Sequence, residues 1–175
     1  YANVPALLPL HESTIADAFT EALTSALSST VLTPEQEEFW RTDPVVASKA
    51  EPAGCDPISL LDGKQDIWLA SCGGFFSSPY ADPGSPCAQP FWGCLECPNA
   101  VITARKLPAI LSFLAFLEDQ RLSLSAGHWA AKFATAHARI TMQILPAFGA
   151  ATVEEARRVL ASEPVSNYMP PEALQ

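Results

Sequence analysis

The sequence contains no apolar run long enough to cross a membrane. The best candidate, residues 107–117, is about half of the roughly 20 residues that a helical span requires, and it contains Pro108 and Ser112. The first ten residues also lack the basic start and the apolar block of a secretory signal. We therefore expect a soluble, cytoplasmic protein. Because the chain begins with Tyr1 rather than Met, we expect a processed N-terminus or a piece of a longer protein.

Basic residues are scarce in the first hundred positions, which hold 3 Lys and Arg against 13 Asp and Glu. An acidic balance of this kind is unfavourable for nucleic acid. Residues 101–158 reverse it, with 7 basic and 4 acidic side chains. If the chain contacts DNA, we expect nonspecific, salt-sensitive phosphate contacts from Arg105, Lys106, Lys132 and Arg139. The alternative is an ordinary solvated helical face, on which scattered Lys and Arg are common.

Regular structure is scarce between residues 51 and 100, where prolines and glycines interrupt every periodic pattern. A loop of this length inside a compact domain is uncommon unless it has a function or something holds it in place. The segment also carries more aromatic side chains than disordered segments have, namely Trp68, Phe75, Phe76, Tyr80, Phe91 and Trp92. We predict an ordered loop that wraps on a core.

Helical patterns flank this loop on both sides. Thr33, Pro34 and Gln36 form a capping-box start, after which Phe39 and Trp40 are predicted to turn inward. The apolar spacing predicts helices over 13–26, 33–42, 106–122, 125–146 and 152–161. The longest of them has an apolar stripe made of Trp129, Phe133, Ala136, Ile140 and Ile144. Its other stripe, which we expect to face solvent or a partner, consists of His128, Lys132, Thr135 and Arg139.

Four of the five cysteines fall in one short stretch, at Cys72, Cys87, Cys94 and Cys97. The last two form a Cys-x-x-Cys pair, which lets one tight turn direct two thiolates at a single ion. Two further sulfurs from the preceding loop would complete a tetrahedron suited to Zn²⁺. The sequence therefore predicts a closed, structural zinc site that holds the loop in place.

Other interpretations of the cysteines stay open at this point. Disulfides need an oxidising compartment, and an odd count without an export signal argues against them. A thioredoxin-like redox pair needs Cys94 at a helix start after a strand, and residues 91–93 are a weak strand candidate. An iron–sulfur cluster also uses four cysteines, and the Cys97-Pro98 step occurs in some ferredoxins. We interpret Cys55 as a half-buried thiol, although it could replace one of the four.

Histidine does not add to the cluster in the sequence, because His11, His128 and His137 all lie far from the cysteines along the chain.

The helical patterns and the cysteine cluster together predict a mostly α fold, a small helical bundle with a long irregular, Cys-rich, zinc-stapled loop. We divide the chain into a linker at 1–12, a helical zinc-binding domain at 13–163 with the Cys-rich loop at 51–100, and a loose tail at 164–175.

Several segments resemble the cysteine-containing C-terminal extension of bacterial phage-integrase, or tyrosine-recombinase, proteins. They are residues 68–72, Cys87, 91–103 and 106–110. Residues 1–7 and His11 are similar to the segment that leaves the recombinase catalytic domain, so the resemblance covers most of the chain.

In that family a tyrosine near the end of the catalytic domain attacks a DNA phosphate, and Tyr1 matches this nucleophile by its place in the pattern. The arginines and histidines that assist the tyrosine are absent from this chain. A tyrosine hydroxyl near its free pKa of about 10 is a poor nucleophile alone. We therefore expect no enzyme activity from this chain by itself.

The resemblance implies a noncatalytic C-terminal module that contributes DNA contact or assembly in site-specific recombination. Its partners would be DNA, the upstream recombinase domain or other protomers, with no membrane and no small-molecule substrate. The competing interpretation is a protein–protein interaction module with a purely structural metal site, in which acidic N-terminal helices dock onto a partner. A Cys-x-x-Cys redox protein is the third.

Overall fold

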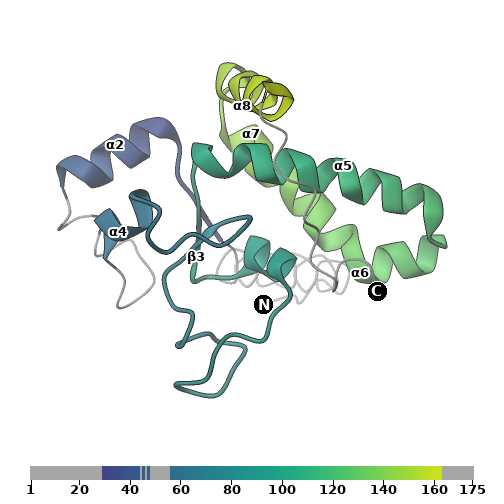
Figure 1. Ribbon diagram of the computed structural model, residues 1–175, viewed down its shortest axis with the longest axis horizontal. Helices are drawn as coiled ribbons and strands as arrows, with labels where there is room; N and C mark the ends of the chain where they lie inside the picture. The colour runs from purple at the N-terminus through teal and green to yellow at the C-terminus, as the bar shows by residue number, and fades with distance from the viewer. Residues whose placement is uncertain (1–28, 44, 46, 48–55, 163–175) are drawn as a thin grey trace, which may run out of the picture.

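The computed structural model describes residues 29–43, 45, 47 and 56–162, and the structural statements below refer to these (Figure 1). The expected helix over 13–26, the linker at 1–12, the tail at 164–175, Tyr1, His11 and Cys55 lie outside the described residues. The described part is mostly helical, as the sequence predicts. None of its helices combines the length and apolar character needed to cross a membrane.

Helices α5 (Leu107–Ser123) and α6 (Ala126–Arg139) form a hairpin that supplies about half of the buried residues of the larger core (Figure 1). Pro108 occupies the first turn of α5, where its missing N–H has no intrahelical acceptor to lose. Ser125 caps α6 by accepting a hydrogen bond from the N–H of His128. Both helices start within two residues of the predicted positions.

The chain continues from α6 into a π-helical turn (Ile140–Ile144), the short helix α7 (Leu145–Ala147) and α8 (Ala150–Ser162). Helix α8 packs against α5 and the 3₁₀ helix η2 (Ala104–Lys106). It begins at Ala150 rather than at the predicted Thr152, because the carbonyl of Gly149 already accepts the N–H groups of Thr152 and Val153 in the first turn.

The apolar stripe predicted for residues 125–146 is buried at all five positions, namely Trp129, Phe133, Ala136, Ile140 and Ile144.

A second, smaller core lies beneath α2 (Pro34–Thr42) and α4 (Pro57–Leu61). Both bonds of the predicted capping box at Thr33 are present. Trp40 is buried as predicted, whereas the inward orientation predicted for Phe39 is wrong, because its side chain is 50% exposed. The helix has a single buried position, so its apolar face is narrower than the sequence suggests.

A small three-stranded sheet, which the sequence does not predict, joins the two cores. Its strands are β1 (Thr30–Val31), β3 (Ala100–Ile102) and β2 (Ser71–Cys72), in the spatial order β1-β3-β2. Strand β1 pairs parallel to β3, and β2 pairs antiparallel to it with Cys72 opposite Ala100. Alternate residues of β3 enter different cores, since Ala100 and Ile102 belong to the larger core and Val101 to the smaller one.

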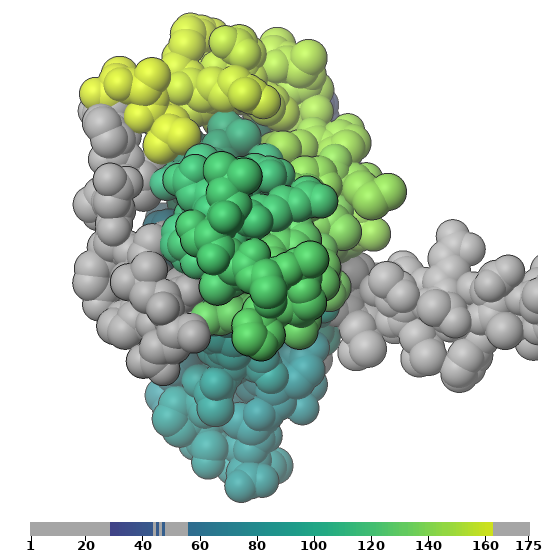
Figure 2. Space-filling view, turned by 90° about the vertical axis from the view of Figure 1, so that its right-hand side faces the viewer, coloured from purple at the N-terminus to yellow at the C-terminus, as the bar shows by residue number. Residues whose placement is uncertain are grey.

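The Cys-rich loop is anchored on the helical hairpin by aromatic side chains. The ring centroid of Phe91 lies 4.7 Å from that of Trp68 and 5.3 Å from that of Phe113, and Trp92 lies 5.7 Å from Phe133. In the space-filling view the loop forms a teal lobe beyond the green helices (Figure 2). An ordered loop wrapped on a core is therefore what the described residues form.

We expect Phe113→Ala to lower the free energy of unfolding by about 3–5 kcal/mol, because the fully buried ring contacts both the hairpin and the loop. Urea denaturation monitored by circular dichroism measures this change. Leu122→Ala is the matched control, since Leu122 is 88% exposed and its truncation should change the value by less than about 0.5 kcal/mol. Equal losses in both variants would contradict the assigned core.

Candidate metal centre

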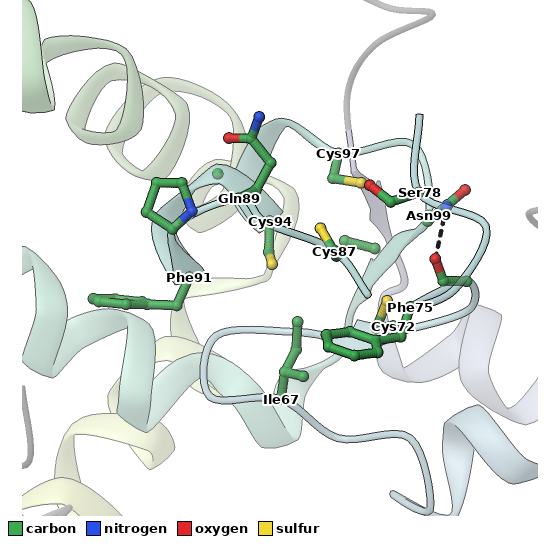
Figure 3. A pocket seen from close by; sticks show the side chains of 14 residues that line it. Ile67, Cys72, Phe75, Ser78, Cys87, Gln89, Phe91, Cys94, Cys97 and Asn99 are labelled. Carbon is green, nitrogen blue, oxygen red and sulfur yellow. Dashed lines mark hydrogen bonds between the residues drawn. The ribbon is translucent and has the colours of Figure 1, made fainter. Parts of the chain in front are cut away.

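All four cysteines of the predicted site line a single pocket of about 290 Å³ (Figure 3). Cys72 ends strand β2, and Cys87 lies in the loop, where its N–H donates to the carbonyl of Phe75. Cys94 belongs to the 3₁₀ helix η1 (Phe91–Glu96), and Cys97 follows directly at the end of that helix. Two separate chain segments thus contribute two sulfurs each.

Hydrogen bonding from backbone amides acts to lower the pKa of two of the thiols. The donors are the N–H of Gly74 for Cys72 and the N–H groups of Asn99 and Ala100 for Cys97. Each of these hydrogen bonds favours the thiolate and so acts to lower the pKa of the thiol that accepts it. The tight turns after Cys72 and Cys97 are therefore arranged to stabilise negative charge on sulfur.

Burial opposes that charge when no cation is nearby. It raises the pKa of Cys72 and Cys97, and it raises the pKa of Cys94 to about 12. Neighbouring thiolates act in the same direction, because Cys94 lies close enough to the other three for their charges to repel its own. A divalent cation would reverse this balance, since it attracts all four charges at once.

The donor set fits a soft, thiophilic ion, but the sulfurs are not yet arranged around one. Within the described ranges, no three His, Cys, Asp or Glu side chains already surround a metal-sized point. The cysteines would have to converge from the walls of their shared pocket. Neither described histidine lines that pocket, so a mixed Cys/His site has no support there.

The other interpretations of the cysteines find less support in the geometry. Cys72, Cys87, Cys94 and Cys97 are all free thiols, with no disulfide among them. A redox pair needs a lowered thiol pKa, whereas the pKa of Cys94 is raised. Moreover, Cys94 sits inside a 3₁₀ helix that follows the extended residue Pro90, not at the start of an α-helix after a strand.

A charged network next to β2 fixes the position of Cys72. The Asp66 carboxylate accepts hydrogen bonds from Ser71 Oγ at 2.6 Å and Arg105 Nη2 at 3.0 Å, and it lies 2.8 Å from Lys106 Nζ. Lys106 Nζ also donates to the carbonyl of Ile67 at 2.7 Å. The network ties the start of α5 to the strand that carries Cys72.

The four predicted DNA contacts differ in exposure and in the partners that their charges already have. Lys106 is only 7% exposed, because its ammonium is held inside the protein by Asp66 and the carbonyl of Ile67, and this position disfavours the predicted phosphate contact. Arg105 donates to the carbonyls of Leu61 and Leu60 and pairs with Asp66.

Arg139 is also turned inward, although the sequence places it on the outer stripe of the long helix. Its guanidinium donates to the carbonyls of Leu95 at 3.1 Å and Ser29 at 2.8 Å, which joins α6 to η1 and β1. Lys132 Nζ lies 5.7 Å from the ring centroid of Trp92 and 5.2 Å from that of Phe133. DNA binding by this chain stays a prediction that only a binding measurement can decide.

Sequence analysis missed the residues that support the cysteines. Asp66 and Ser71 bond to each other but form no recognisable motif, and the two cations that hold Asp66 come from residues 105 and 106. Asn99 had a recognisable signal, since Asn after a Cys-Pro step is a turn residue whose side chain commonly bonds backbone groups. Gly74 is the fourth residue of this supporting group.

Comparisons with known proteins return no match: no family model, no curated protein and no solved structure is similar to this chain. The resemblance to integrase-like C-terminal regions therefore stays a prediction.

We expect the Asp66 network to make stability depend on acid pH. Burial acts to raise the pKa of Asp66, but hydrogen bonds from Lys106, Ser71 and Arg105 outweigh it and hold the pKa below its ordinary value of 3.8. Asp66 thus contributes stability that is complete above pH 3.8 and is lost as the pH falls through the lowered value.

Asp66→Asn should lower the free energy of unfolding at pH 7 by about 1–3 kcal/mol and flatten its decline below pH 4. Denaturation curves recorded between pH 2 and pH 7 measure both effects. The exposed Asp82, replaced by Asn, is the control and should preserve the wild-type acid profile. A wild-type slope in the Asp66 variant would show that the network does not stabilise the fold.

Proposed function

We propose that this chain is a noncatalytic helical module in which one Zn²⁺, held by Cys72, Cys87, Cys94 and Cys97, fastens the Cys-rich loop to the helical core. The observation that carries the proposal is the placement of all four thiols on one pocket (Figure 3). Amide N–H groups directed at Cys72 and Cys97 support it, since such donors stabilise metal-bound thiolates.

The donor set favours a structural metal over a catalytic one. Four thiolates fill a tetrahedral coordination shell and leave no position for a water or a substrate. The remaining pocket walls include the apolar side chains of Ile67, Phe75 and Phe91, and no carboxylate or histidine lies among the lining residues. A general base for hydrolytic chemistry is thus missing from this pocket.

Assembly with a protein partner is the activity that the surroundings of this site favour. Lys106 donates to the carbonyl of Ile67 and pairs with Asp66, and Arg139 donates to internal carbonyls. Few of their N–H donors therefore remain for a phosphate. The lobe next to the site instead exposes the aromatic rings of Phe75 and Phe76. In line with the integrase-like resemblance, the partner we propose is the upstream recombinase domain or another protomer.

The protein purified from zinc-containing medium should hold one zinc per chain, measured by elemental analysis together with the ultraviolet–visible spectrum. Chelation should lower the melting temperature, because a ligand at about a thousandfold excess over its dissociation constant stabilises the folded state by about 4 kcal/mol. Cys94→Ser and Cys97→Ser should lose the metal, whereas Cys55→Ser should keep it.

Two outcomes would contradict this expectation in different ways. Iron with inorganic sulfide and visible absorption would indicate an iron–sulfur cluster on the same cysteines. Loss of zinc in Cys55→Ser, with retention in one of the other variants, would show that the ligand set is wrong.

The assembly role predicts weak DNA binding. In fluorescence anisotropy with duplex DNA we expect no saturable binding below about 100 µM protein at 50 mM salt, since nonspecific binders normally reach about 1–100 µM at physiological salt. Replacing Lys132, whose half-exposed side chain lies over Trp92, by Gln should then change nothing. Micromolar affinity that falls steeply by 200 mM salt would instead assign the module to DNA contact.

A further inference from the structure

The candidate metal centre has two halves, namely the segment that carries Cys72 and Cys87 and the turn that carries Cys94 and Cys97. Asn99 lies between them. Its side-chain amide donates to the carbonyl of Gly74 at 3.2 Å (Figure 3) and to the carbonyl of Ser77 at 3.1 Å, both in the segment between Cys72 and Cys87. The backbone carbonyl of Asn99 accepts a hydrogen bond from the N–H of Gly73 at 2.7 Å. On the other side, Asn99 follows Cys97 by two positions, inside the turn that the Ala100 N–H closes by donating to the Cys97 carbonyl at 3.0 Å.

This arrangement needs a glycine opposite Asn99. A Cβ atom at position 74 would lie 2.7 Å from Asn99 Nδ2 and 2.5 Å from Ser77 Oγ, closer than side-chain atoms approach one another. The backbone carbonyl of Gly74 can reach the Asn99 amide only because that space is empty. Gly74 follows Cys72 by two positions, so the contact with Asn99 also fixes the turn by which the chain leaves Cys72.

Few other polar contacts join the two halves. Strand pairing holds Cys72 opposite Ala100, and Gly73 N–H donates to the Asn99 backbone carbonyl. From Gly74 to Cys87 the backbone bonds of the described chain are short-range, such as Cys87 N–H to the Phe75 carbonyl at 2.9 Å. The Asn99 side chain spans 25 and 22 positions of sequence to reach Gly74 and Ser77.

Resting on the proposed function, we propose that Asn99 is the positioning residue of the metal centre. It holds the loop that supplies the Cys72 and Cys87 sulfurs against the turn that carries Cys94 and Cys97, so that all four stay on one pocket from which they can converge on an ion. It is not a metal ligand and acts through the backbone groups that it fixes. Outer residues of this kind typically change metal affinity by 10- to 100-fold when they are replaced.

The test measures Zn²⁺ affinity by competition with a chromophoric chelator for the full chain and its variants. Asn99→Ala should raise the dissociation constant 10- to 100-fold, while one zinc still binds at saturation. Asn99→Asp keeps the shape but loses both N–H donors, so it should weaken binding at least as much. Ser77→Ala is the matched control, because Asn99 contacts the backbone carbonyl of Ser77, which that substitution leaves in place.

A spectroscopic measurement separates positioning from general stabilisation. With Co²⁺ as the probe, wild type and Ser77→Ala should share the intense visible bands of a tetrahedral thiolate site, whereas Asn99→Ala should show weaker, shifted bands. A variant that melts earlier without metal but keeps the wild-type affinity and spectrum would overturn the assignment of Asn99. If the wild-type chain itself binds neither ion, the proposed metal centre fails, and the role of Asn99 fails with it.

Discussion

The pairing of β3 with its two neighbouring strands is the constraint on which the rest of the structure depends. The three residues of β3 contribute to both cores, and the strand lies between β1 on one side and β2 on the other. Cys97 precedes β3 by three positions, and α5 begins shortly after it. The sheet therefore fixes the Cys94–Cys97 turn, the end of β2 and the start of the hairpin, all of which lie within a few residues of the paired positions.

Electrostatics around the cysteines are balanced between two opposing effects. Burial makes thiolates unfavourable in this pocket, while amide N–H groups at Cys72 and Cys97 favour them. Buried polar groups with preformed donors but no counter-charge are costly, and a bound cation relieves that cost. The salt-bridged network at Asp66 stabilises the same site, because its hydrogen bond to Ser71 holds the strand residue next to Cys72.

Sequence reasoning located the helices well because their signals are local. The capping box at Thr33, the cap at Ser125 and the stripe from Trp129 to Ile144 all depend on residues within a few positions of one another. The sheet escaped detection, since strands of two or three residues show no alternation and β1 pairs with a segment about 70 positions away.

Candidate site residues divide in the same way. The Cys-x-x-Cys spacing predicts from local geometry that Cys94 and Cys97 lie together, and the described structure places Cys72 and Cys87 on the same pocket, while zinc binding stays a prediction. The sequence groups Lys106 and Arg139 with surface cations, because their acceptors, the carbonyls of Ile67 and Leu95, are backbone atoms that no sequence pattern shows. The role of Asn99 depends on Gly74, which becomes its neighbour only after the loop has folded.

Gly84 closes a turn of the Cys-rich loop, where the backbone has φ at +82° and no atom lies within 4 Å of the position of a Cβ. Its N–H donates to the carbonyl of Phe76, and the N–H of Cys87 donates to the carbonyl of Phe75, so these two bonds close the loop below residues 78–83. A change in length within 78–83 should therefore leave Cys87 in place and be tolerated independently of the four thiols.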